Sequence, residues 1–319
     1  MNTIHEQLNL IGIIPVVVID DSNNAESLAQ VLYESGLSTM EITFRTDAAE
    51  ESIERISKTY PAIILGAGTV LNIEQVKTAI DCGAKYIVSP GFNCKVVEYC
   101  FHNNIPVIPG ITTPTEIESA MEMDLKVVKF FPAEAAGGID YLKAISAPYK
   151  MVKFIPTGGI DESNFLPYLK LPQVLACGGS WMVKAEYIKT KRFDDIKILA
   201  STAVSKMFGF QLLRMGINDA DKVEAAKNAS LLCQWINLPI KESDSSIFVG
   251  TQFEFLKSLS IGKHGYIDIG TNFIDRAIAY FENKGIAVRR ETMVKKNDRI
   301  SSVFLNIEIG GFAVHLIQL

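Results

Sequence analysis

Short apolar segments alternate with longer polar segments from the start of the chain to about residue 206. The polar stretches, such as 25–35, 48–58 and 73–81, have the apolar spacing of amphipathic helices. Apolar segments without alternation indicate parallel strands that are buried on both faces. Eight strand–helix units therefore predict an α/β fold of the (β/α)8 TIM-barrel type. The eight segments, rich in Ile and Val, are 11–19, 39–45, 62–70, 86–91, 105–111, 127–132, 153–159 and 174–180.

A doubly wound open sheet is the alternative fold for these residues. Sheets of that kind commonly bind dinucleotides through a GxGxxG turn after the first strand. No such motif follows residues 11–19. Eight units in about 200 residues also fit a compact barrel, which is the fold we expect.

The pattern changes after residue 206, where we place a domain boundary between 1–206 and 207–319. A strand, a helix and further strands are expected at 210–217, 221–236 and 246–257. The same order follows at 265–269, 272–284 and 303–317. The repetition predicts a smaller α+β domain built from two βαβββ units.

Composition and charge narrow the possible functions. Hydrophobic content of 48% and charged content of 21% are typical of a globular protein. The net charge of −5 argues against nucleic-acid binding, so any bound phosphate must be held locally. The longest apolar run, 10–19, contains Gly12 and Pro15 and is too short to cross a membrane. The N-terminus has no basic region or cleavage pattern, so a cytoplasmic protein is expected.

Cysteine and histidine usage gives no indication of a metal site. The five cysteines are an odd number and form no CxxC pair, so we expect reduced and mostly buried thiols. The four histidines form no HxxxH or HxH pair, which argues against a histidine-based zinc site. No cofactor is therefore expected.

Lys129 is the most informative candidate for chemistry. It lies within the apolar segment 127–132, in the sequence KFFPAE. Burial disfavours the charged form of a lysine. A neutral lysine amine attacks carbonyl groups to form a Schiff base. The competing interpretation is a lysine at a strand end that extends to water.

Barrel enzymes carry their chemistry at the carboxyl ends of the strands. The second strand ends in EITFRT, in which Glu41 and Arg45 lie four residues apart and, in an extended strand, on one face. Glu41 suits proton transfer near Lys129, although a structural ion pair is the alternative. Arg45 suits a bidentate contact with a substrate carboxylate, and Thr69 adds a hydroxyl group.

Paired glycines follow the last two strands of the predicted barrel, in PTGGI and GGSW. Barrels often bind phosphate at these loops through backbone N–H groups. Two ordinary tight turns are the alternative. The residues concerned are Gly158, Gly159, Gly178, Gly179 and Ser180.

Seven strand ends together resemble those of the 2-keto-3-deoxy-6-phosphogluconate (KDPG) aldolases, a family that includes 4-hydroxy-2-oxoglutarate (KHG) aldolases. The motifs are EITFRT, GAGTVL, SPG, PGITT, KFFPAE, PTGGI and GGSW, over roughly residues 5–205. The resemblance implies that Lys129 forms the Schiff base and that Glu41 is the general acid and base. It implies that Arg45 and Thr69 hold the pyruvate portion of the substrate, and that Pro90 and Phe131 line the site.

The resemblance also implies a phosphate site at Gly158, Gly159, Gly179 and Ser180. Thr157 matches a position that favours the gluconate-derived substrate over its galactonate epimer. The implied reaction is a metal-free class I cleavage of the keto-acid phosphate to pyruvate and glyceraldehyde 3-phosphate. Cleavage of 4-hydroxy-2-oxoglutarate and a homotrimeric assembly are implied as well.

The duplicated unit beyond residue 207 resembles the vicinal oxygen chelate fold of glyoxalases. Metalloenzymes of that fold carry His or Glu on the inner strands of both halves. Here Arg214 or Met215, and then Tyr266, stand at first-strand positions. Glu254 and His315 alone do not complete a metal site. We therefore expect a binding or assembly module, with His264 and His315 as ordinary strand residues.

Three functional classes remain open from the sequence. The first is the Schiff-base aldolase. The second is a phosphate-binding barrel isomerase or epimerase, in which Lys129 acts only through its charge. In the third, residues 207–319 carry the main activity, as a separate lyase or a binding protein.

Overall fold

The computed structural model describes residues 3–319. Met1 and Asn2, which open the N-terminal segment discussed above, lie outside the described residues. The chain forms two compact units, Met1–Val204 and Ser205–Leu319. The division between the two units and the predicted boundary at residue 206 both lie within helix α10 (Phe193–Phe208).

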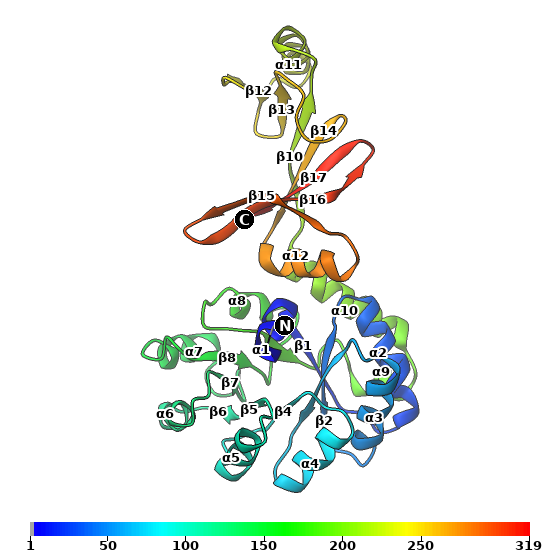
Figure 1. Cartoon of the computed structure of the whole chain (residues 1–319), viewed down its shortest axis with the longest axis vertical. Helices are drawn as coiled ribbons and strands as arrows, with labels where there is room; N and C mark the ends of the chain where they lie inside the picture. The colour runs from blue at the N-terminus through cyan, green and yellow to red at the C-terminus, as the bar shows by residue number, and fades with distance from the viewer. Residues whose placement is uncertain (1–2) are drawn as a thin grey trace. The chain divides into compact units, whose positions relative to one another are not determined.

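Unit 1 contains parallel strands surrounded by helices (Figure 1). Every strand lies inside one of the eight predicted apolar segments, and β5 and β6 share one segment. The strands are β1 (Ile13–Val17), β2 (Thr39–Thr43), β3 (Ile64–Gly68), β4 (Tyr86–Val88), β5 (Val107–Ile108), β6 (Gly110–Ile111), β7 (Val127–Phe130), β8 (Lys153–Pro156) and β9 (Cys177–Gly179).

The strands of unit 1 close into a barrel. Six of them pair in the order β5-β4-β3-β2-β1-β9, and three pair as β6-β7-β8. Only Pro109 separates β5 from β6, and the bridge between Thr157 and Gly178 joins the β8 and β9 sides. The open-sheet alternative is wrong, because the last strand, β9, pairs with the first, β1.

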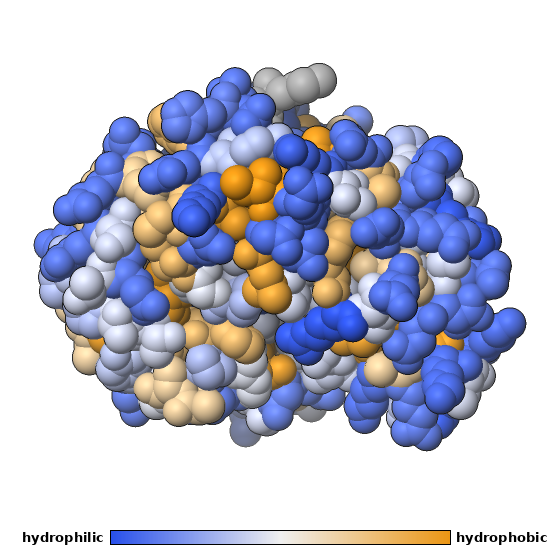
Figure 2. All heavy atoms as spheres, turned by 90° about the horizontal axis from the view of Figure 1, so that it is seen from below, coloured by the Kyte–Doolittle hydropathy of each residue, from blue (hydrophilic) through white to orange (hydrophobic). Residues whose placement is uncertain are grey.

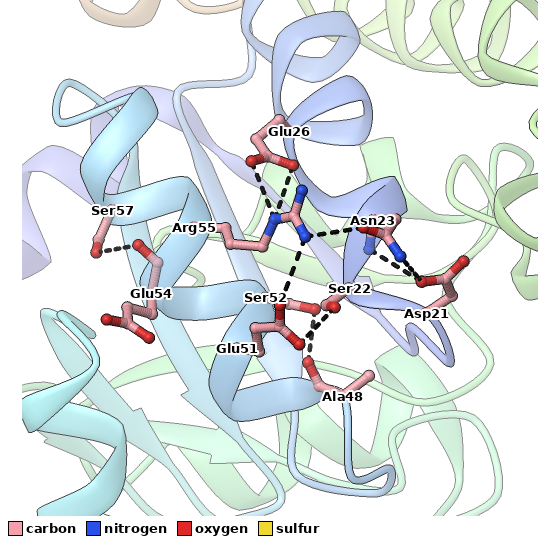
Figure 3. A network of polar contacts seen from close by, with 10 residues as sticks. All are labelled: Asp21, Ser22, Asn23, Glu26, Ala48, Glu51, Ser52, Glu54, Arg55 and Ser57. Carbon is pink, nitrogen blue, oxygen red and sulfur yellow. Dashed lines mark hydrogen bonds and ion pairs between the residues drawn. The ribbon is translucent and has the colours of Figure 1, made fainter.

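Amphipathic helices follow the strands, as their apolar spacing predicts. Their bounds are α2 (Ala25–Glu34), α3 (Ala49–Thr59), α4 (Ile73–Asp81), α5 (Cys94–His102), α6 (Pro114–Glu122), α7 (Gly138–Ser146), α8 (Phe165–Leu169) and α9 (Ala185–Lys189), with a 3-10 turn, η1 (Ser22–Asn24), before α2. A surface network ties η1 and α2 to α3 (Figure 3). In it, Arg55 Nε lies 3.0 Å from Glu26, and Ser22 donates a hydrogen bond to Glu51. Arg55 and Glu26 are half-buried, and ion pairs this close to the surface contribute little to stability.

One helix, α1 (Ile4–Ile11), precedes the first strand and was not predicted. Thr3 and Glu6 cap its start reciprocally, and Gly12 ends it in the left-handed region with φ of 77°. Leu8 is fully buried in a cluster with interior residues of the barrel, among them Ile14, Tyr86 and Val127. The helix therefore contributes to the core of the barrel.

Unit 2 is a single eight-stranded sheet with two helices, α11 (Lys222–Ile236) and α12 (Ile274–Asn283). The strand order is β11-β12-β13-β10-β14-β17-β16-β15. The bounds are β10 (Gln211–Asn218), β11 (Ile240–Glu242), β12 (Ser246–Val249), β13 (Phe253–Leu256), β14 (Gly265–Thr271), β15 (Val288–Lys296), β16 (Arg299–Ile309) and β17 (Phe312–Gln318).

The two halves of this sheet have the same topology. The first strands, β10 and β14, pair antiparallel at the centre. From each of them outward, the fourth, third and second strands of that half follow. The element order is thus βαβββ twice. The edge strands β11 and β15 fell outside the predicted ranges, because their side chains are largely polar and exposed.

None of the helices in residues 3–319 combines the length and apolar character needed to cross a membrane. On the face drawn in Figure 2, hydrophobic residues lie in groups between hydrophilic ones. Scattered apolar side chains of this kind are normal on protein surfaces.

Candidate active site

Lys129 and Glu41 meet inside the barrel. Three strand positions separate β2 from β7 in either direction around the ring, so these strands face each other across the interior. Lys129 Nζ lies 3.1 Å from Glu41 Oε1. The two residues are only 5% and 3% exposed, respectively. Lys129 is therefore a buried interior residue and does not extend to water.

Removal of either Lys129 or Glu41 alone would destabilise the protein. Removing one partner of a buried ion pair leaves an uncompensated charge, typically at about 3–5 kcal/mol. The 3.1 Å separation also allows a proton to pass directly between the amine and the carboxylate. The Nζ atom lies 5.3 Å from the centre of the Phe131 ring. The arrangement provides a nucleophile, a proton carrier and an apolar wall.

Glycines of β3 provide the space for these side chains. A Cβ atom on Gly68 would lie 2.2 Å from Glu41 Oε1. One on Gly66 would lie 2.3 Å from the Tyr86 ring. Because residues two apart on a strand share a face, both glycines face the interior. The GAG sequence is thus required by side chains from β2 and β4.

Tyr86 is a neighbour of the pair that sequence reasoning missed. It is fully buried, and its hydroxyl lies 3.3 Å from Thr39 Oγ1. Burial first, and then the nearby Glu41 carboxylate, raise the pKa of Tyr86 well above its ordinary value of 10.0. The phenol therefore stays neutral. The glycine at 66 was the signal that a large side chain fills this space.

Thr69 directly follows β3 and adopts a rare backbone conformation. Its φ is +58°, which is unusual for a β-branched residue. Strain of this kind persists where the surrounding structure fixes the chain and is frequent at functional sites. Thr69 is half-buried. It lies at the carboxyl end of its strand, as predicted.

Arg45 lies in a different position from the one predicted. Strand β2 ends at Thr43, and Arg45 is exposed in the turn beyond it. The expectation that Glu41 and Arg45 share one face of an extended strand is therefore wrong. Among residues 3–319, no hydrogen bond or ion pair joins Arg45 to Glu41 or Lys129. Arg45 remains at the carboxyl end of the barrel, where a ligand could bring these groups together.

The loops after β7 and β8 hold each other at the same end of the barrel. Ala133 N donates to Thr157 O at 2.8 Å, and Glu134 N donates to Gly158 O at 3.0 Å. Gly158 has φ of 95°, and a Cβ there would lie 3.2 Å from the Phe131 ring. The structure thus brings Phe131, Thr157 and Gly158 together. Thr157 is buried, whereas Gly159 is exposed.

The remaining predicted residues lie at or just beyond strand ends on this side of the barrel. Pro90 is half-buried after β4, and a Cβ on Gly110 would lie 2.1 Å from its carbonyl oxygen. Gly179 ends β9, where a Cβ would lie 2.0 Å from the Trp181 ring. Ser180 follows it and is exposed. Glycine at 179 is therefore needed for packing, whatever the loop binds.

The thiols are free but less buried than predicted. Cys100 and Cys177 are buried, Cys82 and Cys233 are half-buried, and Cys94 is exposed. The expectation of mostly buried thiols is therefore wrong. In residues 3–319, no three His, Cys, Asp or Glu side chains are grouped so that they could hold a metal ion.

Comparison with known proteins places the barrel in a family. A 2-dehydro-3-deoxy-phosphogluconate aldolase of Treponema pallidum (strain Nichols) is 46% identical over 200 residues, covering 63% of this chain and 95% of the relative. The KHG/KDPG aldolase of Escherichia coli (strain K12) is 41% identical over 192 residues, 60% of this chain and 90% of the relative.

Solved structures of KDPG aldolases are also similar to this chain. The KDPG aldolase of Legionella pneumophila, which holds pyruvate as a covalent carbinolamine intermediate, matches with a TM-score of 0.61 and 38% identity, over 63% of this chain and 98% of that one. The Zymomonas mobilis ZM4 enzyme with 3-phosphoglycerate matches with a TM-score of 0.59 and 33% identity, over 63% of this chain and 94% of that one. A family model for KDPG and KHG aldolase covers residues 4–199. The chain belongs to the KDPG and KHG aldolase family, a family of lyases.

Proposed function

We propose that unit 1 is a class I aldolase that cleaves 2-dehydro-3-deoxy-6-phosphogluconate to pyruvate and glyceraldehyde 3-phosphate. The observation that carries this proposal is the buried contact of 3.1 Å between Lys129 Nζ and Glu41 Oε1. A primary amine beside a carboxylate, shielded from water, suits Schiff-base chemistry. The covalent pyruvate adduct in the Legionella pneumophila aldolase supports the same chemistry here.

The reaction begins when Lys129, after passing its proton to Glu41, attacks the C2 ketone. The carbinolamine takes up a proton from Glu41 and loses water to give the iminium ion. Glu41 then removes the proton of the C4 hydroxyl, and the C3–C4 bond breaks. Its electron pair moves into the iminium, which releases glyceraldehyde 3-phosphate and leaves an enamine. Protonation at C3 and hydrolysis of the resulting imine release pyruvate and restore the amine.

The surrounding residues take the remaining roles in this proposal. Arg45 and Thr69 bind the carboxylate of the pyruvate portion, and Phe131 and Pro90 form apolar walls. Thr157 contacts the hydroxyl-bearing carbons and sets the preference for the gluconate-derived epimer. The phosphate lies at Gly158, Gly159, Gly179 and Ser180, where backbone N–H groups suit an anion.

The proposal also includes a second substrate and an oligomeric state. The same site cleaves 4-hydroxy-2-oxoglutarate to pyruvate and glyoxylate, which the naming of the Escherichia coli relative supports. We expect a homotrimer, as in the family. For unit 2 we propose the vicinal oxygen chelate fold, supported by its duplicated βαβββ order.

Borohydride trapping tests the central step. The full chain is incubated with pyruvate and sodium borohydride, and peptide mass spectrometry locates the product. We expect Lys129 to gain the mass of pyruvate less one oxygen atom, because condensation loses water and reduction adds two hydrogens. Lys129→Arg should abolish both the adduct and substrate cleavage.

Lys126→Arg is the matched control, because Lys126 is exposed directly before the same strand. It should keep both the adduct and the activity. A wild-type chain that gives neither a trapped adduct nor cleavage products would instead support the isomerase or epimerase class, in which Lys129 acts through charge alone.

A further inference from the structure

The two faces of the sheet in unit 2 are chemically different. On one face, Ala225 and Ala229 of α11 pack against Ile247, Val249 and Phe255. Because side chains alternate along a strand, Ser246, Phe248 and Glu254 lie on the opposite face. That opposite face carries buried charge. A buried charge away from the apolar core requires partners or a function.

A continuous polar network crosses this face at the junction of the two halves. Arg214 of β10 contacts Asp268 of β14 through Nε and Nη2, both at 2.8 Å. Its Nη1 lies 3.2 Å from Glu254 Oε2, to which Tyr266 also donates at 2.6 Å. His315 Nδ1 lies 2.8 Å from Asp268 Oδ1. His315 is therefore a member of this network, whereas the sequence suggested an ordinary strand residue.

The hydrogen bonds within the network leave donors free on its cationic side. Each of the four oxygens of Asp268 and Glu254 already accepts a hydrogen bond, with Ser246 Oγ on Glu254 Oε1 at 2.6 Å. Arg214 has five N–H donors, of which the contacts above use three. The two remaining N–H groups of Arg214 suit a hydrogen-bond acceptor, and a carboxylate is one that matches their planar geometry.

Aromatic rings frame these unused donors. The Phe304 ring stacks on His315 with centroids 4.0 Å apart and an angle of 8°. Tyr266 lies edge-on to both rings. The Arg214 guanidinium lies 5.7 Å from the Phe248 ring. Flat rings beside a guanidinium and an imidazole favour a flat, partly apolar ligand.

We propose that this face of unit 2 is a binding site for a small carboxylic acid with a flat remainder. The carboxylate accepts hydrogen bonds from the free N–H groups of Arg214, and the flat remainder lies against the stacked Phe304 and His315 rings and Tyr266. Asp268 holds the imidazole and the guanidinium in place from behind. No step of this proposal depends on the barrel's chemistry.

Benzoate is the probe, and benzamide is its neutral control of the same shape. Isothermal titration calorimetry of the full chain should show saturable benzoate binding and at least about tenfold weaker benzamide binding, because a charge-assisted contact is lost. Equal affinity for the two compounds would overturn the proposal.

Variants then locate the site. His315→Asn keeps an N–H for Asp268 but removes the ring that stacks on Phe304, and Arg214→Lys keeps the charge but loses the planar fork. Each should weaken benzoate binding by about tenfold, while thermal unfolding shows that the chain is still folded. Arg45→Ala, in the barrel, should leave the Kd unchanged. Unchanged Kd values for both unit 2 variants, or loss of binding in Arg45→Ala, would show that the proposed site is wrong.

Discussion

Gly68 determines where the Glu41 carboxylate can lie. A Cβ at this position would approach Oε1 to 2.2 Å, so any side chain there would force the carboxylate to move. The distance between Glu41 and Lys129 therefore depends on a residue that carries no functional group. Because proton transfer needs hydrogen-bond reach, small displacements of the carboxylate should affect catalysis more than folding.

Replacing Gly68 with alanine tests this dependence. We expect kcat to fall by at least about 100-fold, since general acid and base catalysis contributes roughly 10²–10⁴-fold. The free energy of unfolding should fall by about 1–3 kcal/mol because of overpacking. Steady-state kinetics and urea unfolding measure the two effects.

Gly91→Ala is the matched control for this substitution. No atom lies within 4 Å of a Cβ built there, and its φ is outside the left-handed region. It should leave kcat and stability nearly unchanged. Wild-type kcat in Gly68→Ala would mean that Glu41 does not need its observed position.

Some residues of the site could be located from the sequence, whereas others were misplaced or missed. Lys129 and Glu41 could be found because each stands within a buried strand, where a charge is unusual. Arg45 was misplaced because strand β2 ends at Thr43, and a residue spacing cannot show where an extended segment stops. Tyr86 was missed because its contact with Gly66 joins two strands through side-chain packing, which leaves little pattern in either segment.

Helix α6 shows how an element supports the site from outside. Thr113 and Glu116 form a reciprocal cap at its start, with Pro114 as the first helical residue. The preceding residue, Thr112, donates its hydroxyl hydrogen to Phe131 O at 2.7 Å. The Glu116 carboxylate also accepts from Thr112 N. The cap therefore fixes the segment that holds the backbone of Phe131.

Glu116→Ala should destabilise the protein by about 1 kcal/mol at pH 7. Burial raises the pKa of Glu116, but hydrogen bonds from Thr112 and Thr113 outweigh this effect and lower it below the ordinary value of 4.5. A lowered pKa means that the charged form stabilises the fold above pH 4.5, and that this contribution disappears as the pH falls through the folded-state pKa.

The stability difference between wild type and Glu116→Ala should therefore shrink on acidification, as urea unfolding over a pH series can measure. Thr115→Ala, an exposed substitution in the first turn of the same helix that changes no titratable group, should show no such pH dependence. A difference that stays constant with pH would mean that the charge of Glu116 has no part in the cap.

Helices and strands could be predicted from the sequence wherever their burial produced a pattern of apolar positions. All eight barrel segments contain strands, because both faces of those strands are covered. The polar edge strand β11 gave no such pattern, since all three of its residues are exposed. Helix α1 was overlooked because only Leu8 of its eight residues is buried.

At the scale of the whole molecule, the two units have separate cores. The Treponema pallidum relative is matched over 95% of its length by 200 residues of this chain, so a barrel of this family needs no second unit. A chain ending at Phe208, the last residue of α10, should fold and keep its aldolase kcat. Circular dichroism and steady-state kinetics test this expectation. Loss of cleavage in a folded truncated chain would show that the activity needs residues 209–319, which would contradict this expectation.

The pairing of β9 with β1 has a consequence for synthesis of the protein. Residues Ile13–Pro15 can pair with Cys177–Gly179 only after that later segment has left the ribosome. Until then, one edge of the growing sheet carries unpaired backbone groups, which attract other extended chains. Nascent barrels are thus vulnerable to aggregation through most of their translation, and the later emergence of residues 205–319 gives them time to close first.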